Sequence, residues 1–310
     1  MPARDAAASR LPPLLMLRAF EATGRTGSMR KAADDLGVSH TVVSRHVRNL
    51  EGWMGRKLLT AGPRGVTLTA EGQILLASVS KAFRLIANTA GELRSTRNGA
   101  VLRIWCIPGL ATRWLTPRLA IIEDILRGTD VVLRSTDAMP DFASGEADLA
   151  IGFGDFDSIA TAGMPLLRPR MFPLASPQWL ASHGAPASLA DLPNRPLIHE
   201  ESHRQWTDWF EAAGVGSGHP LHGPRLWDAS LGLDAARSSQ GIALGSRILA
   251  ADDLASGRLV ELFDTNIHLG GYYVVSAHQR HGNPAIDRLI AWLGAELNLA
   301  ERDGQRQSDR

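Results

Sequence analysis

Residues 28 to 51 constrain the fold of this chain more than any other stretch, because SMRKAADDLGVSHTVVSRHVRNLE predicts two short helices joined by a tight turn. Apolar residues recur at helical spacing from Met29 to Leu36, and Gly37 then supplies the permissive backbone that a sharp turn needs. Ser39 stands where an N-cap belongs, so we expect the second helix to begin at about His40.

The second predicted helix has two unlike faces. Its apolar side carries Val42, Val43, Val47 and Leu50, and its opposite side carries His40, Thr41, Ser44, Arg45 and Arg48. A solvated helix face usually mixes charges of both signs, but this one contains no carboxylate before Glu51. We therefore favour a helix-turn-helix whose second helix enters the major groove of DNA over an ordinary helical hairpin.

The flanking segments extend this prediction. A first helix, from residue 12 to the glycines at 24 to 27, would back the pair and bury Leu14, Leu17 and Phe20. After Gly55, two short apolar runs at 58–60 and 66–68 flank a Gly-Pro-Arg-Gly turn and predict a β-hairpin. Such a hairpin is a wing, and Arg64 at its tip could reach the DNA backbone or the minor groove.

The formal net charge of +1 hides an uneven distribution. Residues 1 to 66 contain eleven Lys and Arg against five Asp and Glu, a balance of +6, which leaves −5 for residues 67 to 310. A domain that meets phosphates carries such an excess. No apolar run approaches the roughly 20 residues that span a bilayer, and the first residues lack an apolar signal core, so we expect a cytoplasmic protein without a membrane partner.

A long helix is predicted from about residue 69 to 93. Its apolar residues repeat at alternating spacings of four and three, the seam of a coiled coil: Gly72, Leu76, Val79, Phe83, Ile86, Ala90 and Leu93. This short segment contains no other element against which the stripe could pack. We therefore expect the helix to pair with the same helix of a second chain. The alternative, a stripe packed on the neighbouring domain of its own chain, stays open.

Beyond a polar hinge at residues 94–99, strands and helices alternate, which indicates a parallel sheet flanked by helices. Two crossings, near 165–169 and 264–269, would divide this region into a hinged pair of lobes. We expect strands at 101–106, 131–134, 147–153, 172–175, 197–199, 225–227, 242–244 and 272–276, and helices at 111–126, 139–144, 177–183, 203–213, 229–239, 246–254 and 284–299.

Two sets of motifs carry a family resemblance. LRAFEATGRTGSMRKAADDLGVSHTVVSRHVRNLEGWMGRKLL and RGVTLTAEG, between Leu17 and Gly72, resemble the N-terminal domain of LysR-type transcriptional regulators. LRIWCIPGLATRWLTPRL, DFASGEADLAIGFGD, DLPNRPLIHE, QGIALGSRILAADDLASGRLV and YYVVSA resemble the effector domain of the branch that includes the glycine-cleavage activator and the β-lactamase regulator.

The resemblance implies an α/β protein in three parts. These are a winged helix-turn-helix at 12–69, a dimerising linker helix at 70–95, and an effector domain at 99–300 that is folded like a type 2 periplasmic binding protein. Lobe I would contain about 99–167 and 269–300, and lobe II about 168–268. The implied function is sequence-specific, effector-modulated regulation by a homodimer or homotetramer on double-stranded DNA, with RNA polymerase as a further candidate partner and no cofactor.

By the same resemblance, DNA is contacted by Ser28, Arg30, His40, Thr41, Ser44, Arg45, Arg48 and Arg64. One departure concerns the wing, where the family usually has an Arg in a Glu-Arg-Thr run and this chain has Thr60, Ala61 and Gly62. We therefore expect weaker wing contacts.

The effector is expected between the lobes, where strand ends meet helix N-termini whose N–H groups suit an anionic ligand. The matching positions are Cys106, Ile107, Pro108, Gly109, Ser135, Thr136, Phe153, Ser202, Asp228, Ala229 and Ser230, with the stretch 199–203 as a whole. The related branch commonly has Thr-Thr-Pro-Ser where this chain has residues 106–109, so hydroxyls are lost there. An amino acid or peptide-like ligand stays open, but we expect a less polar molecule.

Other chemistry has less support in the sequence. A single cysteine excludes an intramolecular disulfide and a Cys-cluster metal site, and Cys106 is more typical of a packing residue than of an oxidant sensor. His219 and His222 have a metal-like spacing without a third ligand nearby. A solute-binding protein would need an export signal, and no catalytic constellation can be assembled for an enzyme.

Overall fold

The computed structural model describes residues 11–62, 65–94, 100–155, 163–216, 220–277 and 283–308. The chain divides into two compact units, residues 1–94 and 95–310, and each is considered by itself.

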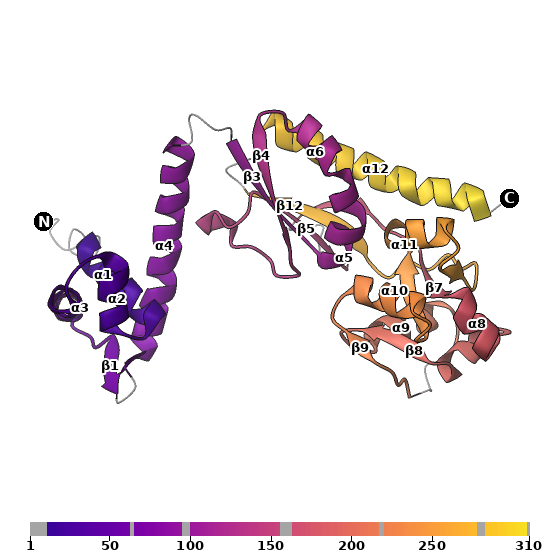
Figure 1. The fold of residues 1–310 in the computed structure, drawn as a ribbon, viewed down its shortest axis with the longest axis horizontal. Coiled ribbons are helices and arrows are strands. Elements are labelled where there is room, and N and C mark those ends of the chain that lie inside the picture. Colours follow the sequence, from indigo (N-terminus) through magenta and orange to yellow (C-terminus); the bar gives the residue numbers. More distant parts are fainter. Residues whose placement is uncertain are drawn as a thin grey trace, which may run out of the picture. The chain divides into compact units, whose positions relative to one another are not determined.

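The first unit contains three helices, a hairpin and a long helix (Figure 1). The turn predicted from Gly37 is confirmed, since this residue ends the second helix with φ of 65°, and Ser39 caps the third helix by accepting a hydrogen bond from the Val42 N–H at 3.4 Å. The elements are α1 (Leu14–Thr26), α2 (Met29–Leu36), α3 (His40–Met54), β1 (Leu59–Gly62), β2 (Gly65–Leu68) and α4 (Ala70–Arg94).

The predicted core of this unit is confirmed except at its start. Leu17 and Phe20 are buried as expected, but Leu14 is 60% exposed because the first turn of α1 extends past the core. The expected hairpin is confirmed, with β1 antiparallel to β2 and Leu59 opposite Leu68.

Glu51 fixes the position of the hairpin relative to α3. Its buried carboxylate accepts hydrogen bonds from the Leu58 and Leu59 N–H groups at 3.0 and 3.2 Å and from the Lys57 ammonium at 2.7 Å. Burial opposes its charge, but these donors hold the pKa of Glu51 below its ordinary value. Thus the carboxylate that ends the basic face of α3 anchors the strand after it.

The stripe on α4 packs largely within its own chain. Val79 is buried in the core of the first unit, Leu76 and Phe83 are packed against that core, and a side chain at Gly72 would collide with the Leu58 carbonyl oxygen. The expectation that the whole stripe faces a second chain is therefore wrong for this half. Ile86 is exposed, Ala90 is half-buried, and the Leu93 side chain lies outside the described residues.

The second unit contains two five-stranded sheets. The first has the strand order β4-β3-β5-β12-β6. Strands β4, β3 and β5 are parallel, and β12 is antiparallel to both of its neighbours, β5 and β6. Its strands are β3 (Ala100–Cys106), β4 (Thr129–Ser135), β5 (Leu149–Gly154), β6 (Met164–Leu167) and β12 (Gly271–Ser276).

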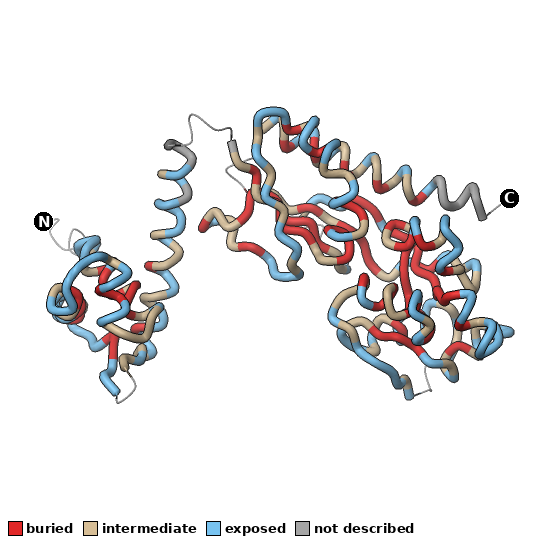
Figure 2. The backbone as a smooth tube through the Cα atoms, in the orientation of Figure 1, coloured by how far each residue is buried: buried red, intermediate tan, exposed pale blue. Residues whose placement is uncertain are grey.

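The second sheet has the order β11-β7-β10-β8-β9, in which β10, β8 and β9 are parallel and β7 is antiparallel to β10 and β11. Its strands are β7 (Met171–Ala175), β8 (Leu197–Glu200), β9 (Arg225–Leu226), β10 (Ile242–Ser246) and β11 (Val260–Glu261). The central strands of both sheets are largely buried (Figure 2).

The helices cover these sheets, and α12 (Pro284–Ser308) packs against β6 of the first sheet. One expected helix is interrupted, since residues 111–126 pass from a π-helical turn into a 3-10 turn around Pro117 before becoming regular again. Around 139–144 only a 3-10 turn forms. The remaining elements are α5 (Pro108–Leu110), η1 (Ala111–Leu115), η2 (Thr116–Arg118), α6 (Leu119–Ile125), η3 (Phe142–Ser144), α8 (Pro177–His183), η4 (Leu189–Asn194), α9 (Arg204–Ala212), α10 (Ala229–Arg237) and α11 (Arg247–Ala255).

The chain crosses between the sheets twice, as predicted, from β6 to β7 and from β11 to β12. The sequence analysis missed β6 and β11. β11 has only two residues, and Pro165 in β6 resembles a linker residue although it occupies an edge strand, where proline is tolerated.

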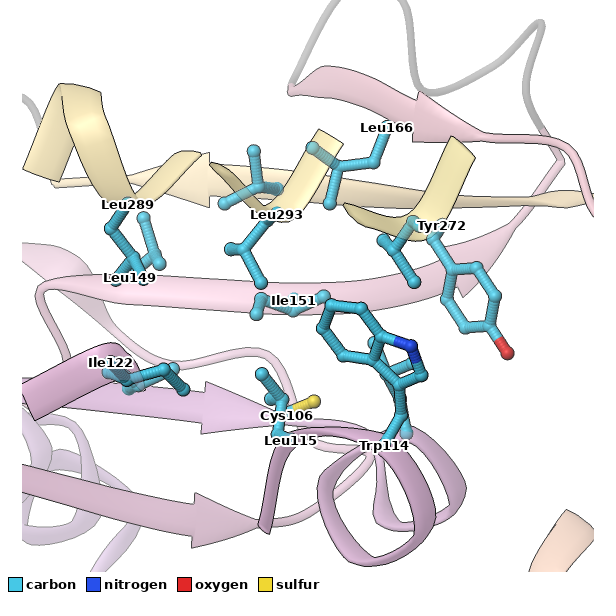
Figure 3. Close-up of a cluster of buried hydrophobic side chains, with 14 of the residues drawn as sticks. Cys106, Trp114, Leu115, Ile122, Leu149, Ile151, Leu166, Tyr272, Leu289 and Leu293 are labelled. Atoms are coloured by element: carbon cyan, nitrogen blue, oxygen red, sulfur yellow. The ribbon is translucent and has the colours of Figure 1, made fainter. Parts of the chain in front are cut away.

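The first sheet and its helices form lobe I, and the core of this lobe surrounds Cys106. Figure 3 shows the Cys106 side chain among Leu115, Ile151 and other apolar residues. The Cys106 thiol is completely buried, and burial raises its pKa far above the ordinary value. The structure therefore gives Cys106 the packing role that the sequence favoured over oxidant sensing.

Candidate functional site

The predicted DNA-facing residues of α3 lie on its surface. His40, Thr41, Arg45 and Arg48 are exposed and Ser44 is half-buried, with its hydroxyl accepting a hydrogen bond from Arg48 Nη2 at 2.9 Å. This face contains no carboxylate, because Glu51 turns inward toward β1. Its cations are therefore not neutralised by acids of the same face.

The start of α2 adds to this surface. Ser28 is the N-cap of α2 and accepts a hydrogen bond from the Lys31 N–H, while Arg30 is exposed in the first turn. Neither Arg30 nor Arg45 forms an ion pair with any residue that the structure describes. Arg64, the predicted wing residue, lies outside the described residues.

A second apolar face of α4 is exposed. Ile74 and Leu85, eleven residues or about three turns apart, lie on one side of the helix, away from the stripe that packs on the core of the first unit. The sequence analysis missed this face because Ser78 and Lys81 interrupt its apolar character.

A cavity of about 280 Å³ lies between the two lobes of the second unit. Lobe I contributes the chain after β3 and β4 and the ends of β5 and β12, and lobe II contributes the ends of β8 and β10 and the starts of α10 and α11. The lining is Ile107, Pro108, Gly109, Asp137, Phe153, Met171, Glu200, Glu201, Gln205, Trp227, Asp228, Ala229, Gly245, Ser246, Leu249 and Tyr272.

Six of the predicted effector residues line this cavity: Ile107, Pro108, Gly109, Phe153, Asp228 and Ala229. The other five lie outside its lining. Cys106 points into the core, Ser135 ends β4 at the surface, and the Thr136 N–H donates to the Cys106 carbonyl. The Ser202 hydroxyl accepts from the Arg204 N–H, and the buried Ser230 follows the Asp228 cap inside α10.

The sequence analysis missed most of the charge in this cavity. Asp137, Glu200 and Glu201 are additional lining residues, although the stretch 199–203 had been singled out as a whole. The sequence could have indicated two of these acids, because Glu200 and Glu201 come directly after a predicted strand, at the strand end where a ligand site is expected. Gly245 and Ser246, expected only to start a helix, also line the cavity.

The inner carboxylates are Glu200 and Asp228. Burial raises the pKa of the Glu200 carboxyl to about 7, and the negative charges of Asp228 and Glu201 act in the same direction while a hydrogen bond with Gln205 opposes it. Asp228 caps α10, since its Oδ1 accepts from the Ser230 N–H at 2.8 Å. The α10 N-terminus is therefore already occupied by a carboxylate.

Two polar contacts join the lobes beside the cavity. Trp227 Nε1 donates to Asp137 Oδ2 at 2.9 Å across the opening. Arg113 of η1 reaches across to lobe II, where it pairs with Asp253 at 2.8 Å, pairs with Asp234 and donates to the Ser230 carbonyl. Asp253 is 2% exposed and also pairs with Arg258, so this cluster fixes the start of α5 and η1 against α10 and α11.

Metal ligation finds no support in the described part of the chain, where no three His, Cys, Asp or Glu side chains gather in a way that could hold a metal ion. His219 lies outside the described residues. No helix in the described part of the chain has the length and apolar character needed to span a membrane.

A helix-turn-helix unit followed by a two-lobed domain with a central cavity defines a class of DNA-binding regulators that carry a small-molecule sensor. Residues 14–73 match the family described as "Bacterial regulatory helix-turn-helix protein, lysR family", and residues 95–298 match "LysR substrate binding domain". The chain belongs to the LysR family and is a LysR-type transcriptional regulator with a DNA-binding domain and an effector-binding domain.

The curated relatives are regulators of similar length. The glycine cleavage system transcriptional activator of Escherichia coli (strain K12) is 29% identical over 86% of this chain and 88% of its own. The HTH-type transcriptional regulator PerR of the same strain is 33% identical over 93% and 97%, and the HTH-type transcriptional activator AmpR of Pseudomonas aeruginosa is 32% identical over 94% and 98%.

Solved structures support the same fold. The effector domain of AmpR of Pseudomonas aeruginosa has a TM-score of 0.56 at 26% identity and covers 67% of this chain and 99% of its own. CrgA, a LysR-type transcriptional regulator from Neisseria meningitidis, has a TM-score of 0.56 over 93% of this chain and 99% of its own, and at 22% identity it shows the fold alone.

Proposed function

We propose that this regulator acts in the cytoplasm and binds operator DNA through the exposed face of α3, supported by the start of α2 and by Arg64 of the wing. The observation that carries the proposal is the carboxylate-free row His40, Thr41, Ser44, Arg45 and Arg48 on one helix. Such a helix fits the major groove, where Arg can donate two hydrogen bonds to guanine and hydroxyls can contact phosphates or base edges.

The test compares two arginine variants of the full-length protein. Operator fragments are first selected from genomic DNA by the parent protein, and affinities are then measured by gel shift at a fixed salt concentration. Arg45→Ala should lose about 1 to 3 kcal/mol of specific binding if Arg45 reads a base edge. Arg127→Ala, which removes an exposed arginine of the second unit, should retain the parent affinity. Equal affinities for all three proteins would refute this role of Arg45.

The assembly that we propose is a homodimer or homotetramer whose contact includes the exposed face of α4. Apolar side chains such as Ile74 and Leu85 on a long helix are typical of self-association. Leu85→Asp should weaken self-association in sedimentation, whereas Ala87→Asp, at an exposed position on another side of α4, should not. A Leu85→Asp protein that sediments like the parent would contradict this contact.

The cavity is the proposed effector site. A ligand there contacts both lobes, so it can change their relative placement if it binds one arrangement more tightly than the other. Since several relatives are named as transcriptional activators, RNA polymerase is the partner that we propose for the DNA-bound form. We expect no catalytic activity, because the cavity serves recognition in this scheme.

A further inference from the structure

The charge of the cavity lining identifies the chemical class of ligand that it can hold. Four of the lining residues are carboxylic acids, Asp137 from lobe I and Glu200, Glu201 and Asp228 from lobe II. None of the described lining residues is Lys, Arg or His. We propose that the cavity selects a small organic cation that carries a primary ammonium or guanidinium group, a proposal that rests on the cavity being the effector site.

Two arginines close to the lining pair with acids outside it. Arg113 pairs with Asp234 and Asp253, and Arg247 pairs with Glu261, none of which lines the cavity. Glu200 and Asp228 therefore face each other's negative charge, as the direction of the Glu200 pKa also indicates. A bound cation would offset this repulsion, whereas an anion would add to it.

The carboxylates also retain acceptor capacity. Asp228 Oδ1 accepts the Ser230 N–H and Asp137 Oδ2 accepts the Trp227 indole N–H, but a carboxylate offers about four lone-pair positions. These bonds hold in place one side chain from each lobe. Their remaining lone pairs suit the three donors of an ammonium or the five of a guanidinium.

Ser246 supplies a second and independent observation. It is 1% exposed, it lines the cavity, and its hydroxyl does not cap α11 although it occupies the N-cap position. Ser246 Oγ makes no hydrogen bond of ordinary geometry in the described part of the chain, and its polar neighbour is the buried Tyr272 hydroxyl of lobe I. Since a buried hydroxyl without a partner is costly, this atom is available for a polar group of the ligand.

The remaining lining fits the body of such a ligand. Phe153, Tyr272 and Trp227 bring aromatic rings to the lining, which can attract a cation, and Ile107, Met171 and Leu249 offer apolar contacts to a short carbon chain. The volume of about 280 Å³ lies just below the range of about 300 to 1,000 Å³ for small-molecule sites. A short amine or guanidine is therefore favoured over a large molecule.

This inference differs from the expectation drawn from the sequence. The helix N-termini suit an anion and the motif at 106–109 suggests a less polar ligand, but the α10 N-terminus is capped by Asp228 and acids line the adjacent wall. The Cys106 substitution does not reduce the polarity of the cavity, since its side chain is in the core.

Three four-carbon probes that differ in charge test the inference on the full-length protein. Putrescine is a dication, butane-1,4-diol is neutral and succinate is a dianion, and agmatine adds a guanidinium. Binding is measured by calorimetry and by thermal shift. We expect putrescine or agmatine to bind, and the diol and succinate to bind at least about tenfold more weakly, because hydrogen bonds to charged groups contribute more than neutral ones.

Near-isosteric variants locate the binding. Glu200→Gln and Asp228→Asn should each weaken cation binding at least about tenfold. Asn retains the ability to cap α10, so the fold is preserved. Glu211→Gln removes an exposed acid of α9 outside the lining and should leave the Kd unchanged.

Three results would overturn the inference. The first is tighter binding of succinate or of the diol than of the cations, and the second is cation binding that is unchanged in both Glu200→Gln and Asp228→Asn. The third is that neither putrescine nor agmatine binds. Operator binding by the same preparations keeps the proposed function separate. Intact sequence-specific DNA binding without cation binding would reject only the ligand class, and cation binding without specific DNA binding would reject the proposed function.

Discussion

The exposed face of α3 takes its polar side chains from nine consecutive residues of one helix, whereas the effector cavity collects its lining from segments as distant as Ile107 and Tyr272. The two surfaces also differ in sign. The helix presents cations without carboxylates to solvent, and the cavity encloses carboxylates without described cations. A polyanion and a small cation can therefore be bound by the same chain without competing for one surface.

The difference also concerns rigidity. The α3 face depends on one helix with a capped start and an anchored end, while the cavity depends on how two lobes are held together. Disturbing the supports of each region should therefore break one function and spare the other.

The largest effect is expected from Asp253→Ala in the support of the cavity. Burial alone would raise the pKa of Asp253, but Arg258 and Arg113 hold it below its ordinary value, so the carboxylate is charged and paired. Its removal leaves the half-buried Arg113 without its buried partner and should destabilise the second unit by about 3 kcal/mol. Hydrogen exchange in α10 and α11 measures the loss, with the exposed neighbour Asp252→Ala as control. Equal protection in both variants would contradict the role of the cluster.

A smaller loss is expected from Glu51→Ala in the support of α3. The variant leaves the buried Leu58 and Leu59 N–H groups without their acceptor, which should cost about 1 to 3 kcal/mol in the first unit. Glu51→Gln keeps an acceptor oxygen and should lose less. Hydrogen exchange of β1 separates the two variants, and an unchanged exchange rate in Glu51→Ala would refute the anchoring role.

The same carboxylate predicts a pH dependence. Because the pKa of Glu51 is lower in the folded than in the unfolded chain, its stabilisation is present above the unfolded value of about 4.3 and is lost as the pH falls through the folded value. The difference in stability between the parent and Glu51→Ala should therefore shrink on acidification. A difference that is independent of pH would show that the charge is not involved.

Glu200 predicts a pH dependence of ligand binding in the cavity. It faces Glu201, Asp228 and Gln205, and its pKa of about 7 means that much of the carboxyl is protonated below neutrality. Cation binding requires the ionised form, so the affinity for putrescine should rise by up to about tenfold per pH unit below 7 and level off above it. Without ligand, its raised pKa makes stability fall as pH rises toward 7. Calorimetry of Glu200→Gln should show neither trend, and a pH-independent affinity in the parent would exclude Glu200 as the ionising group.

The sequence was sufficient for the α3 face because every determinant is local. Ser39, the apolar period and the absence of acids can all be observed within one helix, and the hairpin and most strands of the lobes follow from similar short patterns. The first half of the α4 stripe was assigned wrongly for a physical reason: a heptad pattern gives the buried side of a helix but not the partner that buries it.

The cavity could be predicted only in part. Strand ends such as Ile107 and Asp228 can be located from the alternation of strands and helices, but the side on which a residue projects depends on the pleat and on the crossing of the chain. Cys106 and Ile107 are adjacent in sequence, yet one fills the core and the other lines the cavity. Asp137 comes into the cavity through its contact with Trp227 from the other lobe, which no local pattern indicates.

Cleavage of operator DNA by a reagent attached to α3 tests the central claim most directly. Cys106 is buried and its pKa is raised, so a cysteine introduced at the exposed Asn49 or at Glu211 can be labelled selectively with a DNA-cleaving chelate. We predict that labelled Asn49→Cys cuts the operator within its half-sites and that labelled Glu211→Cys, which still binds, does not. Operator binding without cleavage from position 49 would contradict the claim that α3 lies along the duplex.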